Sequence, residues 1–534
     1  MMELNLTAEQ AALWQKMTTF TAQKIAPLDH DIDQQGQFAA KAYALLVQQG
    51  LPQQGLTAPF GQGLDMVSQV LCVMALAQGS ASVATVLASL WQITAQIDRY
   101  GTADQRATLL AAAQTKLMGF AVTEPGGGNA LGVQTTAFKS TTGWLLDGEK
   151  VLITNGGQAA HYLVLAKTDQ NDFAVFIIDA TMPGVKVTQS VDTLGLRGVA
   201  VAGLQLNNVA VTATHLLGQI GQGLEISRYQ QNMARIFNGA LAAGIMQHAL
   251  TQLKSYTRQR HLVDGPLNTF ATAQTQVATM ATTLRATQLL TLDAARQMDR
   301  QPDFAAAATM ATLFGSQNGL TVTNQALQLA GGLAYTNQLP FEQLMRDMRA
   351  LTLIDGPVEM LQQELGAAEL GVANHGHLTA KQPVSVTKRI EVTDFPQVIK
   401  ALRLTEEVPV TVGGIRTAKR IIALGRGADD PEVLLQAQQL AKWIGAAVAV
   451  TRPLTTKEQF SIDQQIGTGG ATVTPEVIIN IGISGSEQYV SGMMGAAHIL
   501  SVNEDATAAI FRVSQQAFVG TAATFLAGIL AALK

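Results

Sequence analysis

The chain has 534 residues, of which 47% are hydrophobic, and its 39 acidic and 35 basic side chains leave a formal net charge of -4. This length can bury more than one core, and the small acidic excess offers no basic field for nucleic acid. Cys72 is the only cysteine, which excludes an intrachain disulfide, a cysteine-based zinc site and an iron–sulfur cluster. We expect small-molecule chemistry in a reducing compartment, with no metal site.

Neither end of the chain has the pattern of a targeting or membrane segment. The first ten residues are acidic and polar, unlike the basic and then apolar start of a signal peptide. The apolar stretch 517–533 carries Gly, Thr and Ala throughout, which favours a buried terminal helix over a membrane span. We therefore expect a cytoplasmic protein without a membrane span or a nucleic-acid partner.

Three successive patterns predict helices, then strands, then helices. Over 1–116 the apolar residues recur at three and four positions, as in 39–49. Between 117 and 217, short β-branched runs such as 144–154 are separated by turn residues. Helical periodicity returns over 218–374. The prediction is a helical domain, a compact β domain and a helical bundle.

A different pattern occupies the last part of the chain. Polar and chain-breaking residues interrupt the helices, so we place a linker at 375–388. Beyond it, over 389–534, short apolar runs typical of buried parallel strands alternate with helical segments. The clearest such runs are 420–425, 445–450, 477–481 and 498–502. This alternation predicts a doubly wound α/β domain, whose ligand would bind at the carboxyl ends of the strands.

The run 475–486 predicts a phosphate cradle within this domain. It reads as a buried strand that breaks into glycines where a helix begins, and backbone N–H groups at such a junction bind phosphate. The segments 425–427 and 451–452, and Asn503, fall at the ends of neighbouring predicted strands. A ligand that carries phosphate is therefore expected at this edge of the sheet.

Residues 1 to about 373 resemble the acyl-CoA dehydrogenases over nearly their whole length. The motifs that carry the resemblance stand in family order: Tyr100-Gly-Thr102, Phe120-Ala-Val-Thr-Glu-Pro125, Gly148-Glu-Lys-Val-Leu-Ile-Thr-Asn-Gly156, Leu194-Gly-Leu-Arg-Gly198, Gln328-Leu-Ala-Gly-Gly332 and Met345-Arg-Asp347. The resemblance implies a β-barrel-like middle domain between two helical domains, bound FAD and an acyl-CoA thioester substrate. It also implies a homodimer or homotetramer in which a neighbouring subunit completes the flavin site.

The reaction of this family needs a carboxylate that takes the α-proton of an acyl thioester while the flavin takes hydride from the β-carbon. In many members this base is the Glu of Tyr-Glu-Gly-Thr, and the matching stretch here is Ile354-Asp-Gly-Pro357. Asp355 is therefore the candidate catalytic base, shorter than Glu by one bond of roughly 1.5 Å. A helix N-cap is the competing interpretation of Asp355. The alternative base position holds Ala234, next to Arg235, the candidate substrate-binding residue.

The resemblance also assigns cofactor contacts in this module. Two threonines match hydroxyls beside the isoalloxazine, one arginine matches a residue that reaches the flavin diphosphate across the subunit interface, and a late motif matches the adenine side. The cofactor-binding residues implied in this way are Thr123, Gly128, Ile153, Thr154, Arg260, Gln328, Gly331 and Gly332.

Residues from about 419 to 534 resemble the C-terminal flavin domain of the electron transfer flavoprotein alpha subunit. The motifs are Gly425-Arg-Gly427, Thr451-Arg452, Gly482-Ile-Ser-Gly485 with Gln488, Gly492-Met493 and Val502-Asn503. If this domain binds a second FAD, the resemblance implies contacts from Arg426, Thr451, Arg452, Ile483, Ser484, Gly485, Ser486, Gln488 and Asn503. The family's His after the cradle is Tyr489 in this chain.

Three hypotheses follow for the whole chain. The preferred one is an FAD-dependent acyl-CoA dehydrogenase or enoyl-CoA reductase with a tethered electron-transfer flavin domain. In the second, the C-terminal domain is a docking module, with a degraded flavin site, for a subunit like the electron transfer flavoprotein beta subunit. The third is a dehydrogenase-like pseudoenzyme. Two, one or no FAD per chain would separate them in that order.

Overall fold

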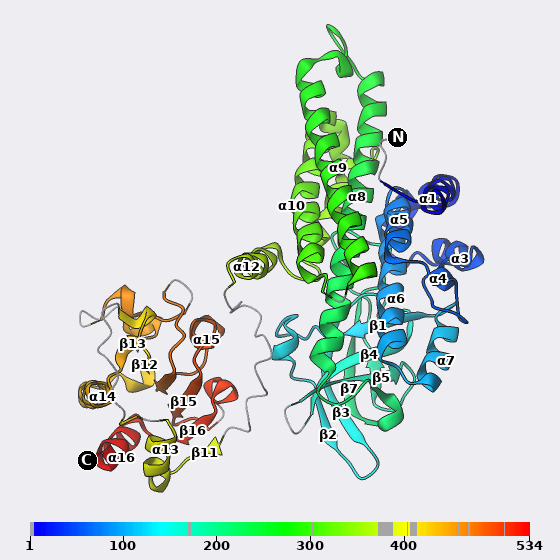
Figure 1. Cartoon of the computed structure of the whole chain (residues 1–534). Coiled ribbons are helices and arrows are strands. Elements are labelled where there is room, and N and C mark those ends of the chain that lie inside the picture. Colours follow the sequence, from blue (N-terminus) through cyan, green and yellow to red (C-terminus); the bar gives the residue numbers. More distant parts are fainter. Residues whose placement is uncertain are drawn as a thin grey trace. The chain divides into compact units, whose positions relative to one another are not determined.

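The computed structural model describes residues 5–168, 172–301, 303–371, 388–402, 404–405, 414–455, 460–467, 470–506 and 508–533. The chain divides into two compact units, Met1–Val372 and Ala373–Lys534. Most of the predicted linker, 375–388, lies outside the described residues. The first unit has helices, then strands, then helices, and the second is built on a parallel sheet (Figure 1).

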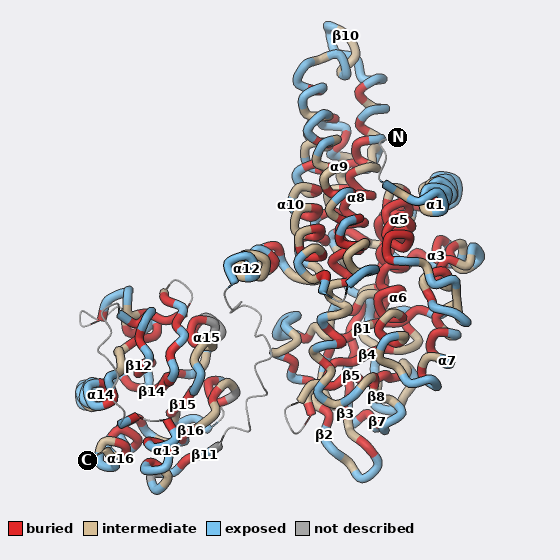
Figure 2. The backbone as a smooth tube through the Cα atoms, in the orientation of Figure 1, coloured by how far each residue is buried: buried red, intermediate tan, exposed pale blue. Residues whose placement is uncertain are grey.

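The first unit begins with seven α-helices: α1 (Ala8–Phe20), α2 (Ala26–Gln35), α3 (Ala40–Gln48), α4 (Leu51–Gln54), α5 (Met66–Ala77), α6 (Ala81–Tyr100) and α7 (Ala103–Ala112). The side chains of Thr7, Asp65, Ser80 and Thr102 cap four of their N-termini by accepting a backbone hydrogen bond. Every residue of α5 is buried (Figure 2), because this helix lies at the centre of the domain.

The middle domain is one sheet of eight strands. Its strands are β1 (Leu117–Ala121), β2 (Thr136–Lys139), β3 (Trp144–Ile153), β4 (Ala159–Thr168), β5 (Phe173–Asp179), β6 (Val185–Val187), β7 (Ala202–Val211) and β8 (Leu216–Leu217). The order is β6-β7-β3-β2-β4-β5-β8, and β1 pairs with β4. No described pairing joins β6 to β8, so the ladder of this barrel-like domain stays open between these two strands.

The helical bundle is built on three long helices that run side by side, α8 (Gly223–Gln259), α9 (Ala271–Arg300) and α10 (Ala305–Ala330) (Figure 1). At 1.5 Å per residue, α8 is about 55 Å long. A small hairpin of β9 (His261–Leu262) and β10 (Gly265–Pro266) lies between α8 and α9. The bundle ends with α11 (Phe341–Ala350) and α12 (Val358–Glu369).

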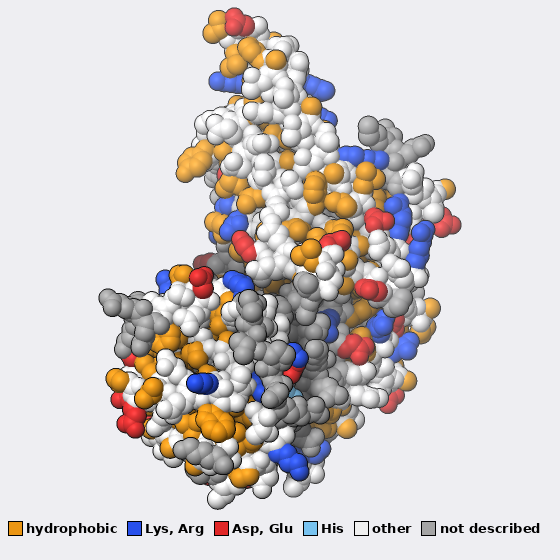
Figure 3. All heavy atoms as spheres, turned by 60° about the vertical axis from the view of Figure 1, so that its left-hand side comes forward, with side chains coloured by type: hydrophobic (Ala, Val, Ile, Leu, Met, Phe, Trp, Pro, Cys, Tyr) orange, Lys and Arg blue, Asp and Glu red, His pale blue; other side chains and the backbone are white. Residues whose placement is uncertain are grey.

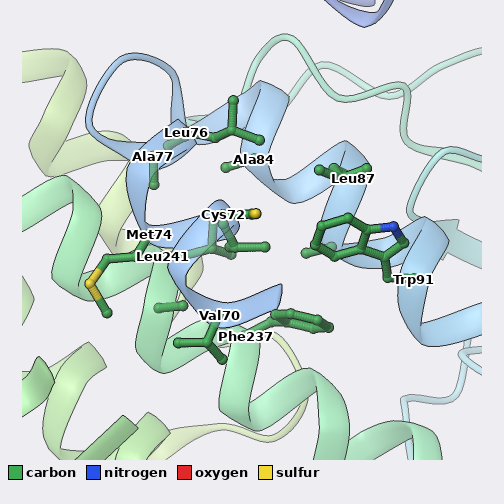
Figure 4. Close-up of a cluster of buried hydrophobic side chains, with 14 of the residues drawn as sticks. Val70, Cys72, Met74, Leu76, Ala77, Ala84, Leu87, Trp91, Phe237 and Leu241 are labelled. Carbon is green, nitrogen blue, oxygen red and sulfur yellow. The ribbon is translucent and has the colours of Figure 1, made fainter. Parts of the chain in front are cut away.

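The main core joins α5, α6 and α8 (Figure 4). The rings of Trp91 and Phe237 lie 6.3 Å apart, and the indole N–H of Trp91 donates to the Pro52 carbonyl at 3.1 Å. Where α5 and α8 touch, a Cβ on Gly244 would lie 2.4 Å from the Cβ of Ala77. Only glycine allows this close approach, which fixes α8 against the N-terminal domain.

The second unit is a six-stranded parallel sheet. Its elements are β11 (Lys388–Arg389), α13 (Phe395–Ala401), β12 (Arg420–Leu424), α14 (Pro431–Ile444), β13 (Ala447–Val450), β14 (Val477–Ile481), α15 (Glu487–Met493), β15 (His498–Asn503), β16 (Gln516–Val519) and α16 (Ala522–Leu533). The strand order is β11-β16-β15-β14-β12-β13. The predicted doubly wound α/β fold is confirmed.

Both faces of this sheet are buried. Along β12, Ile422 and Leu424 pack toward α13, α14 and α16, whereas Ile421 and Ala423 pack toward α15 and short 3-10 segments. The stretch 517–533 is not one helix as expected, because its first residues belong to β16. The helix α16, which follows, buries only one face. In the part of the chain that the structure describes, no helix is long and apolar enough to cross a membrane.

Charged side chains are dispersed over the face shown in Figure 3, where Lys and Arg alternate with Asp and Glu. This scatter matches the near balance of acidic and basic residues in the sequence.

Candidate functional site

Asp355 lies in a strained turn between α11 and α12. Its φ is +54°, in the left-handed region that Asp and Asn tolerate better than most side chains. Gly356 follows with φ +118°, and a Cβ there would lie 2.4 Å from the Met360 methyl carbon. The turn thus needs glycine after the aspartate. It brings the Asp355 side chain against α8.

Three side chains of α8 hold this turn. The Asp355 carboxylate accepts a hydrogen bond from Asn238 Nδ2 at 3.1 Å, and its backbone carbonyl accepts from Arg235 Nε at 3.3 Å and Gln231 Nε2 at 3.5 Å. Burial raises the pKa of the Asp355 carboxyl, while the Asn238 hydrogen bond and the Arg235 charge oppose the rise. The N-cap interpretation is wrong, because Pro357 is the N-cap of α12 and no side chain caps it.

Arg235 is fully buried behind the turn. Its guanidinium donates to both carboxylate oxygens of Glu364, at 2.9 and 2.8 Å, and to Thr309 Oγ1 at 2.9 Å. These partners come from α12 and α10, so Arg235 ties the Asp355 backbone to three helices. This placement supports an anchoring role for Arg235 better than the predicted contact with substrate.

Sequence reasoning missed Asn238, which bonds to Asp355, and Glu364, which pairs with Arg235. Asn238 is 3% exposed within an otherwise apolar part of α8, and a buried amide in such a run needs a hydrogen-bond partner. That signal was available in the sequence. Glu364 had no comparable signal, since it is one of several polar residues on a half-buried helix.

Thr123 and Gly128 lie in the loop after β1, and Ile153 and Thr154 lie at the end of β3, which pairs with this loop. Val151 N–H donates to the Thr123 carbonyl at 2.8 Å, and a Cβ on Gly128 would lie 3.6 Å from Thr123 Oγ1. Ile153 is buried, whereas Thr123 and Thr154 are half-buried. Neither threonine hydroxyl has a hydrogen-bond partner among the described residues, so both are available to a polar ligand such as a flavin ring.

A buried ion pair fixes the loop that contains Thr123 and Gly128. Lys150 Nζ lies 2.8 Å from Glu124 Oε1, which also accepts from the Thr135 hydroxyl at 2.6 Å. Burial alone would raise the pKa of Glu124, but hydrogen bonds from Lys150 and Thr135 outweigh it and lower the pKa. Burial also lowers the pKa of Lys150 to about 8. The pair is therefore charged at neutral pH and connects the loop to β3.

The remaining residues assigned to the first FAD lie far from Asp355 within one chain. Arg260 is exposed at the C-terminal end of α8, about 37 Å along the helix from Arg235. Gln328, Gly331 and Gly332 lie at the far end of α10 from Thr309, about 28 Å along it from Thr309 to Gln328. A Cβ on either glycine would meet nothing within 4 Å. Within a single chain these residues are exposed and lie apart from Asp355.

In the second unit, the loops after β12 and β14 meet where the strand order reverses, which is the usual binding crevice of such a sheet. Gly425 N–H donates to the Ile481 carbonyl at 2.9 Å and Gly427 N–H to the Gly482 carbonyl at 3.0 Å. Gly482 has φ +66°, and a Cβ there would lie 2.4 Å from the Ala428 nitrogen. The two loops therefore require glycine at their contact.

The cradle 483–486 is held from its carbonyl side. Asn503 Nδ2 donates to the Ile483 carbonyl at 2.9 Å, and Ile510 N–H donates to the Ser484 carbonyl at 3.1 Å. The N–H groups of residues 483–486 donate to no group of the described residues, which fits an anion such as a diphosphate.

Other predicted residues lie at the same carboxyl edge of the sheet. Arg426 and Arg452 are exposed, and neither has an acidic partner among the residues described. Thr451 is buried, and its N–H donates to the Leu424 carbonyl at 2.9 Å. Gln488 lies in α15, but its side chain is outside the described part of the structure. The backbone cradle and the two arginines thus lie at one edge of the sheet, an arrangement that would suit an anion.

Tyr489 points away from the cradle. Its hydroxyl donates to Asn480 Oδ1 at 2.6 Å, Asn480 Nδ2 donates to Ser501 Oγ at 3.0 Å, and Ser514 Oγ lies 2.7 Å from Ser501 Oγ. All four side chains are buried. Where the related family has His, this chain therefore has a tyrosine that anchors α15 to the sheet.

Four family models match consecutive parts of the chain. The N-terminal, middle and C-terminal domains of acyl-CoA dehydrogenase match residues 7–116, 119–209 and 221–370. The electron transfer flavoprotein FAD-binding domain matches residues 414–494. Both predicted resemblances are thus confirmed.

Individual relatives agree with these matches. A probable acyl-CoA dehydrogenase of Bacillus subtilis (strain 168) is 30% identical over 371 residues, or 67% of this chain and 97% of that protein. A 3-(aryl)acrylate reductase of Clostridium sporogenes (strain ATCC 15579) is 29% identical over 67% of this chain and 98% of its own length. The solved structure of butyryl-CoA dehydrogenase from Megasphaera elsdenii is 30% identical with a TM-score of 0.67, covering 69% of this chain and 100% of that one. The chain therefore belongs to the acyl-CoA dehydrogenase family of FAD oxidoreductases and carries, in the same polypeptide, a domain of the electron transfer flavoprotein alpha type.

Proposed function

We propose that this protein oxidises or reduces the Cα–Cβ bond of an acyl-CoA thioester, with Asp355 as the catalytic base and the C-terminal domain as a tethered electron carrier. The observation that carries the proposal is the placement of Asp355, a half-buried carboxylate in a strained turn, held by Asn238 and Arg235. Backbone strain of this kind is concentrated at functional sites.

Each proposed site residue of the first unit then has a defined role. When bound, FAD supplies the acceptor or donor of hydride at the substrate β-carbon. Asp355 takes or returns the α-proton, and a pKa raised by burial brings this carboxyl closer to the working pH, which favours general base catalysis. The hydroxyls of Thr123 and Thr154 orient the ring, and the Glu124–Lys150 pair keeps their loop in place.

The first flavin site is completed by a second copy of the chain. Arg260 and the open segment with Gln328, Gly331 and Gly332 are too distant to serve Asp355 of their own chain. Their placement supports a homodimer or homotetramer in which these residues bind the diphosphate and adenine of a neighbour's FAD.

The C-terminal domain binds the second FAD in this proposal. The N–H groups of 483–486 hold its diphosphate, and Arg426 and Arg452 supply positive charge. Because both domains belong to one chain, the encounter between flavins is intramolecular, at an effective concentration of about millimolar.

FAD content and acyl-CoA-dependent flavin bleaching test the proposal. Freshly purified protein should contain two FAD per chain, and Asp355→Asn should retain both while losing the bleaching. One FAD per chain would instead favour a docking module for a beta-like subunit, and none would favour a scaffold. Unchanged bleaching in Asp355→Asn would show that another residue is the base.

A further inference from the structure

The two oxygens of the Asp355 carboxylate have different surroundings. Oδ2 accepts the Asn238 hydrogen bond at 3.1 Å, whereas Oδ1 accepts none from the described residues. The amide and the carboxylate come from α8 and from the turn before α12, and 117 residues separate them in the chain. Their contact is therefore a product of the fold.

We propose that Asn238 is a positioning residue that keeps the Asp355 carboxylate ionised and leaves Oδ1 to receive the substrate proton. This inference rests on the proposed function, in which Asp355 is the base. A hydrogen bond donated to a carboxylate favours its charged form. An amide has no charge to gain or lose between pH 4 and 10, so Asn238 gives this support at every working pH.

The Arg235–Glu364 pair has a separate task in the same assembly. Arg235 holds the backbone carbonyl of Asp355, and Glu364 neutralises the buried guanidinium. A left-handed aspartate persists only where its surroundings determine the backbone, and Arg235 connects this turn to α8, α10 and α12. The side chain of Asp355 is thus set by Asn238 and its backbone by Arg235.

The pH dependence of flavin bleaching by acyl-CoA distinguishes positioning from general support of the fold. Asn238→Leu keeps the approximate size but removes the donor, so the apparent pKa of the base should rise by about one unit. At pH values below that pKa, bleaching should be about tenfold slower than in the wild type, and it should approach the wild-type rate at high pH. A purely structural defect would lower the rate equally at all pH values.

Glu364→Gln provides a test of opposite sign. It removes the carboxylate that pairs with Arg235 and leaves the Arg235 charge uncompensated, so the apparent pKa of Asp355 should fall. Asn318→Leu is a matched control, because among the described residues the Asn318 side chain bonds only to the Phe314 carbonyl of its own helix, and its pH profile should match that of the wild type.

The outcomes separate the inference from the proposed function. If Asp355→Asn abolishes bleaching but Asn238→Leu leaves the apparent pKa unchanged, the positioning role is wrong and the function stands. If Asp355→Asn bleaches normally, the base assignment fails, and the role of Asn238 fails with it. FAD content and the melting temperature of each variant show whether it has folded.

Discussion

Glu124 and Lys150 form a buried ion pair beside the residues assigned to the flavin ring. The Lys150 side chain is fully buried and that of Glu124 is 8% exposed. Removing one partner of such a pair leaves the other as an uncompensated charge, which costs more than the pair contributes when intact. The pair also closes the loop on which Thr123 and Gly128 lie, so its loss should affect both stability and flavin binding.

Lys150→Met should lower the free energy of unfolding of the first unit by about 3–5 kcal/mol and reduce its FAD content. The exposed Lys186 on β6 offers a control, since Lys186→Met should change stability by no more than about 0.5 kcal/mol. Chemical denaturation and the flavin absorbance of purified protein measure the two effects. Equal stability of the two variants would contradict the importance of the pair.

At the scale of single residues, sequence reasoning located Asp355 and Arg235 but not Asn238 and Glu364, which bond to them. A motif reports matching residue types along the chain, whereas these contacts form only after α8 and α12 pack together. The N-cap interpretation failed for a related reason. Local preference places Asp before a helix, but the left-handed turn directs its side chain to α8 instead.

Among the structural elements, α2, α11 and the segment 194–198 form a polar joint between the domains of the first unit. Arg346 donates to both oxygens of Asp33 at 2.8 and 2.6 Å and to the Leu194 carbonyl at 2.9 Å. Asp347 accepts the Leu196 N–H at 2.6 Å. Two of the family motifs are therefore partners in one structural contact.

This joint should make the stability of the first unit depend on pH. Burial, with the nearby charge of Asp29, raises the pKa of Asp347 to about 8, compared with roughly 3.9 in an unfolded chain. The folded state therefore keeps a proton that the unfolded state has lost. The stability from this group is complete below about pH 4 and is lost as the pH rises to about 8.

Asp347→Asn should flatten this dependence, because an amide oxygen can still accept the Leu196 N–H while carrying no charge. Between pH 5 and 8 the melting temperature of the wild type should fall more than that of the variant. Parallel curves for the two proteins would mean that Asp347 ionises normally and that the joint is not pH-sensitive.

The sequence predicted some strands of the second unit and not others, for physical reasons. The strands β12 and β14 were predicted because continuous apolar runs end in glycine. The strand β11 has two residues and too little pattern to detect, and β16 merges with α16 in one apolar stretch. Backbone pairing with β15, which only the folded sheet supplies, defines β16.

For the whole molecule, the fold class could be predicted from the sequence because hydrophobic periodicity changes with each domain. The relation between the two proposed flavin sites could not be predicted, since it depends on ligands and on further subunits. When one site is removed by mutation, the flavin at the other site should therefore be measured in the intact chain.

Arg452→Ala should lower the FAD content from two to about one per chain and leave acyl-CoA-dependent bleaching of the first flavin intact. Lys442 is a suitable control, because it is exposed on α14 away from the cradle loops, and Lys442→Ala should keep both cofactors. Full FAD content in Arg452→Ala would exclude this arginine from the second site.

The length of α8 has a genetic consequence. In its first half the helix carries Arg235 and Asn238, which contact Asp355, the proposed base of the same chain, and at its end it carries Arg260, proposed to serve a neighbour. A chain defective at Asp355 and a chain defective at Arg260 would each be inactive alone. When they are co-expressed, mixed oligomers would contain some catalytic centres with neither lesion, so two null alleles would complement each other.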